Sequence, residues 1–96
     1  MALIYITSIK MVTHVSMLRG INVGSQKRVK MEELIILYES LDFQNVTSYA
    51  QSGNLIFNVS EKIKDLPNII EKEIKQVFSL PVAVLVRTSI EPATNN

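Results

Sequence analysis

The amino-acid sequence contains no cysteine and a single histidine, His14. Without cysteine, the chain can form no disulfide framework, no thiolate nucleophile and no thiolate metal site. Zinc sites usually take several histidine or cysteine ligands, so one histidine excludes most zinc chemistry. We therefore expect the protein to use no metal and no other cofactor.

Long apolar runs and export signals are also missing. The longest wholly apolar runs, such as ALIYI and VAVLV, have five or six residues, whereas a membrane-spanning helix needs roughly 20. The N-terminus lacks the basic region and the longer apolar region of a signal peptide. We therefore expect a soluble protein of the reducing cytoplasm that has no contact with membranes.

Glycine, proline and net charge are low as well. The 96 residues include three Gly and three Pro, with 47% hydrophobic and 20% charged residues, which is typical of one small globular domain. The net charge of +1 gives no overall attraction to nucleic acid. The basic residues are unevenly placed, however, because the segment from Arg19 to Lys30 holds four of them and no acid.

Strand and helix patterns alternate along the chain. The β-branched run Val12–Arg19 predicts a strand. The next apolar residues have the i, i+3, i+4, i+7, i+10 spacing of an amphipathic helix; they are Met31, Leu34, Ile35, Tyr38 and Leu41. The runs NVTSYAQ and NLIFNV then predict a hairpin that turns at Gly53.

A second amphipathic helix and a last strand complete the pattern. An apolar stripe from Leu66 to Phe78 predicts the helix, with Asp65 as its N-cap residue. On its polar side, Glu71 and Lys75 have the i, i+4 spacing of an ion pair. The run VAVLVR predicts the strand.

The order β-α-β-β-α-β predicts a ferredoxin-like α+β sandwich, in which a four-stranded antiparallel sheet carries two helices on one face. We assign this domain to residues 11–91. Residues 1–10 are interpreted as an N-terminal extension, although a further strand there is the alternative, and residues 92–96 as a flexible tail.

Two strings, MLRGINVGSQKRVKMEEL and SYAQSGNLIF, resemble a bacterial family known as domain of unknown function 1697, whose members carry LRGINVGG and TYIQSGNVVF. The resemblance implies ferredoxin-like units and an unassigned activity, so it transfers no catalytic residue. It also implies that the chain matches only the N-terminal half of the longer family members. The motif positions that transfer are Arg19, Gly20, Asn22 and Gly24 in the loop, and Gln51, Ser52, Gly53 and Asn54 in the hairpin.

The loop from Arg19 to Lys30 is a candidate anion site. Glycines between a strand and a helix let backbone N–H groups approach an anion, and basic side chains add charge. The candidate residues are Arg19, Gly20, Asn22, Gly24, Lys27 and Arg28. The string is neither a Walker loop nor G-x-G-x-x-G, so a solvated turn is the alternative.

The face of the sheet without helices is a second candidate surface. We expect it to carry His14, Ser16, Tyr49, Gln51, Asn54, Ile56 and Asn58. RNA-recognition domains stack bases on aromatic residues of the central strands, whereas the third strand here offers Asn, Ile and Asn. Tyr49 alone is poor support, so nucleic-acid binding is not expected here. No acid is placed to orient His14 against Ser16. Whether the protein is an enzyme therefore stays open, with the balance against it, and we assign no catalytic residue.

The last strand is apolar on both faces although it should lie at an edge of the sheet. Such an edge invites pairing with another strand, so we predict self-association, or packing of a missing second half, through Val82, Val84, Leu85 and Val86. The sequence thus predicts an uncharacterised protein that acts as a binding or assembly module. Binding of a phosphate, nucleotide or nucleic acid through loop 19–30 is the alternative.

Overall fold

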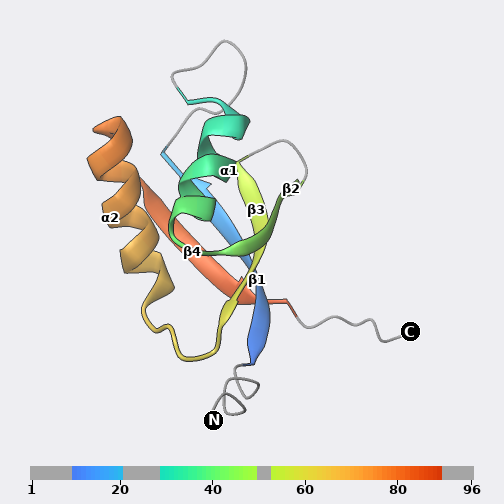
Figure 1. The fold of residues 1–96 in the computed structure, drawn as a ribbon. Coiled ribbons are helices and arrows are strands. Elements are labelled where there is room, and N and C mark those ends of the chain that lie inside the picture. The colour runs from blue at the N-terminus through green and yellow to red at the C-terminus, as the bar shows by residue number, and fades with distance from the viewer. Residues whose placement is uncertain (1–9, 21–28, 50–52, 90–96) are drawn as a thin grey trace, which may run out of the picture.

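The computed structural model describes residues 10–20, 29–49 and 53–89 (Figure 1). Its elements, in chain order, are β1 (Met11–Arg19), α1 (Met31–Ser40), β2 (Gln44–Tyr49), β3 (Asn54–Ser60), α2 (Leu66–Phe78) and β4 (Ala83–Thr88). This order confirms the predicted β-α-β-β-α-β pattern. Residues 1–9 of the predicted N-terminal extension and the tail lie outside the described residues, as do Asn22, Gly24, Lys27, Arg28, Gln51 and Ser52.

The four strands form one antiparallel sheet in the order β2-β3-β1-β4. Strands β1 and β3 are central, and β2 and β4 are the edges. Both helices lie on the same face of the sheet, with α1 packed against β2 and α2 against β4 (Figure 1). The ferredoxin-like sandwich is therefore confirmed, and neither of the two described helices lies on the other face of the sheet.

The core lies between the sheet and the helices. In β3 the alternate residues Leu55, Phe57 and Val59 are buried, as the alternation of the sequence predicts. Phe57 stacks on Phe43 with a centroid distance of 4.8 Å and meets Tyr38 edge-on at 5.2 Å. This aromatic cluster fixes α1 on the sheet.

The hydroxyl of Tyr38 is buried in this core. It shares a 2.8 Å hydrogen bond with Ser16 Oγ, which satisfies both groups. Burial raises the pKa of Tyr38 to about 12, and the bond from Ser16 partly opposes this rise.

The prediction that His14 and Ser16 lie on the helix-free face is wrong. In the register of β1 against β3, His14 pairs with Phe57 and Ser16 pairs with Leu55, so both side chains face the helices. The ring of His14 stacks on Phe57 at 5.7 Å. Each face of β1 carries about the same amount of apolar side chain, so alternation alone does not indicate which face is buried.

The other described residues predicted for the helix-free face are confirmed. Tyr49 pairs with Asn54 and is 54% exposed, and Ile56 and Asn58 alternate with the buried residues of β3. Gly53 at the hairpin has φ +84°, a conformation that glycine adopts without strain.

Helix α2 begins after Asp65, as predicted, but the carboxylate of Asp65 makes no hydrogen bond to the helix backbone. It accepts a 3.1 Å hydrogen bond from Asn68 Nδ2 instead.

In the part of the chain that the structure describes, no helix is long and apolar enough to cross a membrane.

Candidate functional site

Strand β4 lies at an edge of the sheet that the described residues form. It pairs with β1 on one side only, with Met17 opposite Leu85 and Ser16 opposite Val86. The N–H of Ser89 donates to the carbonyl of Thr13 at 2.8 Å, so position 89 faces β1. Because successive residues of a strand direct their backbone groups to opposite sides, Val84, Val86 and Thr88 face outward.

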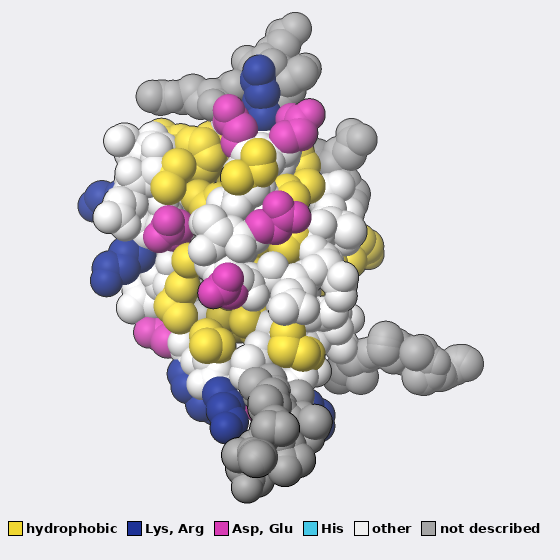
Figure 2. Space-filling view, in the orientation of Figure 1, with side chains coloured by type: hydrophobic (Ala, Val, Ile, Leu, Met, Phe, Trp, Pro, Cys, Tyr) yellow, Lys and Arg dark blue, Asp and Glu magenta, His cyan; other side chains and the backbone are white. Residues whose placement is uncertain are grey.

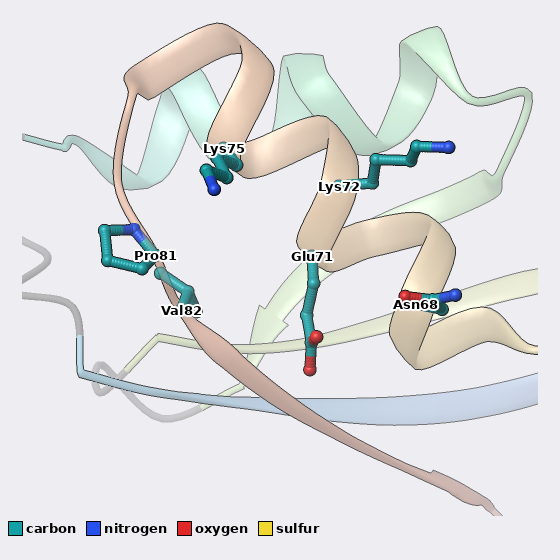
Figure 3. A pocket seen from close by; sticks show the side chains of 6 residues that line it. All are labelled: Asn68, Glu71, Lys72, Lys75, Pro81 and Val82. Atoms are coloured by element: carbon teal, nitrogen blue, oxygen red, sulfur yellow. The ribbon is translucent and has the colours of Figure 1, made fainter.

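One of these outward groups is occupied by a side chain of α2. The N–H of Val84 donates to Oε2 of Glu71 at 2.8 Å, and the bond is partly buried. In Figure 3 the side chain of Glu71 extends from α2 toward β4. The corresponding N–H groups of Val86 and Thr88 have no such partner from α2 among the described residues. The outer edge is therefore covered at its start and open toward its end.

A groove of about 320 Å³ lies beside this contact, between α2 and the segment that leads into β4. Its lining residues are Asn68, Glu71, Lys72, Lys75, Pro81 and Val82 (Figure 3). Lys72 and Lys75 are exposed, so the groove has basic groups beside one carboxylate.

The four apolar residues predicted for the association edge do not share one environment. Val82 and Val84 belong to the core beneath α2, and Val86 packs partly against it. Leu85 points to the other face and is 49% exposed. Helix α2 therefore covers much of the apolar surface that the sequence assigns to a partner. The predicted self-association stays a prediction.

Leu85 extends an apolar strip across the helix-free face. Met17 lies beside it on β1, and Val15 pairs with Ile56 on β3. These three neighbours are half-buried. The strip, formed by Leu85, Met17, Val15 and Ile56, therefore reaches the outer edge of β4.

The predicted anion loop is only partly within the described residues. Arg19 is exposed at the end of β1, and Gly20 follows with φ +84°. Because most of its candidates lie outside the described residues, anion binding stays a prediction.

Ser16 and His14 each have a hydrogen-bond partner other than one another. Ser16 is fully buried and bonded to Tyr38. The Nδ1 atom of His14 lies 3.1 Å from the carbonyl oxygen of Val12 in the same strand. Within residues 10–20, 29–49 and 53–89, no cluster of three or more His, Asp or Glu side chains could hold a metal ion.

A second groove of about 320 Å³ lies between the helices and is mainly apolar. Ile36 and Val77 are exposed at its rim, and Glu33 contributes an acid. Figure 2 shows the helix side of the molecule, where hydrophobic side chains form patches with acidic groups between them. Nothing in the described part of the chain indicates what covers this groove.

Sequence reasoning missed the role of Glu71. The i, i+4 spacing to Lys75 suggests an ion pair on a solvated face, whereas the carboxylate bonds to the backbone of β4. Only the topology, which places β4 beside α2 at the edge, could have indicated this contact.

A family model described as "protein of unknown function (DUF1697)" matches residues 11–94. Among solved structures, the chain is similar to the conserved bacterial protein SP0830 from Streptococcus pneumoniae, with 27% sequence identity and a TM-score of 0.64. The match covers 82% of this chain and 44% of that one, so the chain spans less than half the length of SP0830. No curated protein matches the sequence significantly.

Proposed function

Because the chain belongs to the DUF1697 family, whose description assigns no activity, we propose a function from the geometry of the β4 edge. The protein is a non-enzymatic binding module that assembles by adding a strand to this edge, and the added strand comes from a second copy. The observation that carries the proposal is that Val86 and Thr88 direct backbone groups outward on an edge strand.

The surface beside these backbone groups favours association. The apolar strip ends at Leu85, which is half-exposed next to the open edge. Strand addition supplies main-chain hydrogen bonds, while apolar side chains beside the edge add buried area. A two-fold pairing of β4 with its copy would continue both the sheet and the strip.

The same edge is where further chain would pack in longer relatives. SP0830 has more than half of its length outside the match, and that part is the second candidate to cover β4. We place the assembly in the bacterial cytoplasm, which is supported by the absence of cysteine and by the bacterial origin of this relative.

Sedimentation velocity over a range of concentrations tests the proposal. We expect a monomer–dimer equilibrium by high micromolar concentration. Thr88→Pro removes an outward N–H without breaking the ladder to β1, so it should abolish the dimer. Thr88→Ala keeps the N–H and should leave the dimer intact. A strictly monomeric wild type contradicts the proposal.

Anion binding by the loop is the second candidate function. It is favoured by the four basic residues between Arg19 and Lys30 and by the exposure of Arg19. Nucleotides and short RNAs should bind wild type more tightly than the triple variant Arg19→Ala, Lys27→Ala, Arg28→Ala. Equal, millimolar binding by both proteins excludes this function.

A further inference from the structure

The contact between Glu71 and Val84 has a consequence for how a second strand can pair with β4. A carboxylate oxygen 2.8 Å from the N–H of Val84 takes the place that the carbonyl oxygen of an added strand would take. The bond has an ionised acceptor, so it is stronger than the bond between two peptide groups. An added strand must displace Glu71 to pair at Val84.

We propose that Glu71 guards the β4 edge and sets the register in which a second copy pairs with it. This inference rests on the strand addition proposed above. With Glu71 in place, pairing is restricted to Val86 and Thr88. Val86 then lies opposite Thr88 of the partner subunit, and Thr88 lies opposite Val86 of the partner subunit.

Releasing Glu71 makes a longer pairing accessible. Val84 then lies opposite Thr88 of the partner subunit, and Val86 lies opposite its own copy at the two-fold axis. In an antiparallel ladder each hydrogen-bonded pair contributes two bonds. The released register therefore has three such pairs, whereas the guarded register has two.

A second copy fits this site better than an unrelated strand. A two-fold interface needs a surface that is complementary to itself. The outward N–H and C=O groups of Val86 and Thr88 satisfy this condition, because each donates to and accepts from its counterpart when a copy is turned about the two-fold axis.

Variants of Glu71 separate its role as a hydrogen-bond acceptor from its size. Glu71→Ala and Glu71→Met both remove the acceptor and favour helix, and Met keeps most of the side-chain length. Glu71→Gln is the matched control, because its amide oxygen still accepts from Val84. Circular dichroism establishes that each variant is folded.

Sedimentation velocity should show that Ala and Met lower the dimer dissociation constant by about tenfold or more, because the longer ladder adds two hydrogen bonds. Glu71→Gln should stay within about threefold of wild type. Adding Thr88→Pro to Glu71→Ala should return the protein to a monomer.

The outcomes separate this inference from the function on which it rests. If the wild type forms a dimer that Thr88→Pro abolishes, while Glu71→Ala and Glu71→Met leave the affinity of the dimer unchanged, strand addition holds and the proposed role of Glu71 is overturned. If wild type is a monomer and Glu71→Ala forms a dimer, the guard holds and self-association of the wild type is overturned. Monomers throughout, up to high micromolar concentration, overturn both.

Discussion

The two edges of the sheet are protected in different ways. The β2 edge is polar and irregular: its register shifts between Gln44 and Thr47, and Asn45 there has φ +53°. Bulges and polar residues commonly prevent edge strands from pairing with other chains. The β4 edge is regular and carries Val84, Leu85 and Val86, and one side chain, Glu71, covers its start.

This difference indicates which edge can pair with another chain. The β2 edge is protected by its backbone conformation, which does not depend on the position of one side chain. Protection at β4 depends on one carboxylate, which covers the N–H of Val84 and leaves those of Val86 and Thr88 without a partner from α2 among the described residues. We therefore expect β4 to be the associating edge and β2 to stay single.

The largest expected effect comes from placing a charge on each edge. Val84→Asp buries an unpaired carboxylate under α2, because Val84 is only 4% exposed, and should lower the free energy of unfolding by more than about 3 kcal/mol. Thr47→Asp, on exposed β2, should change it by less than about 1 kcal/mol. Urea denaturation measures both, and equal losses would show that the two edges are buried alike.

The second-largest expected effect is a loss of stability at high pH, which comes from Tyr38 in the core. The unfolded tyrosine ionises near pH 10, whereas burial raises the pKa of Tyr38 to about 12 in the folded protein. The folded state therefore holds its proton more tightly, and stability should be constant below pH 10 and fall as the pH rises toward 12. The loss should approach about 2–3 kcal/mol.

Thermal denaturation between pH 8 and 12 measures this loss, with Tyr38→Phe as the control. The ring of Tyr38 remains in that variant but its ionisation is removed, so the fall between pH 10 and 12 should be smaller. An identical pH profile for both proteins would exclude Tyr38 as the cause.

A smaller effect concerns association through the helix-free face. Leu85→Lys places a charge beside the β4 edge, where lysine commonly blocks strand pairing, and should weaken the dimer by about tenfold, or about 1.4 kcal/mol. Tyr49→Lys places the same charge at the β2 side, where the residue is similarly exposed. We expect no change there, and sedimentation velocity would refute the contrast if both variants weaken the dimer equally.

The smallest effect is strain at the β2 bulge. Asn45 lies in the left-handed region, which a β-branched residue adopts poorly. Asn45→Val should lower the free energy of unfolding by about 1 kcal/mol, whereas Asn45→Gly should cost less than about 0.5 kcal/mol. Urea denaturation of the pair tests the bulge, and a Val variant as stable as the Gly variant would contradict it.

Much of the fold could be predicted from the sequence because hydrophobic periodicity is local. The stripe from Leu66 to Phe78 and the alternation in Asn54–Ser60 predict a helix and a strand that the structure confirms. The face of β1 could not be predicted, because Ser16 is buried through a bond to Tyr38, which is 22 residues away.

The candidate site was harder to predict for the same reason. The apolar run of the last strand suggests an exposed edge, yet Val82 and Val84 are covered by α2. Glu71 looks like a solvated helix residue until the topology brings α2 beside β4. Properties that depend on contacts between distant segments need the three-dimensional arrangement.

Strand addition at β4 can be tested residue by residue, by amide hydrogen exchange of the wild type at several protein concentrations. If β4 pairs with a second copy, the amides of Val86 and Thr88 should become more protected as the protein concentration rises, while those of Thr47 and Ser48 on β2 should not change. Val84 should already be protected at low concentration, because Glu71 accepts from its N–H. Exchange at Val86 and Thr88 that is independent of concentration, or protection that grows at β2 instead, would contradict strand addition at β4.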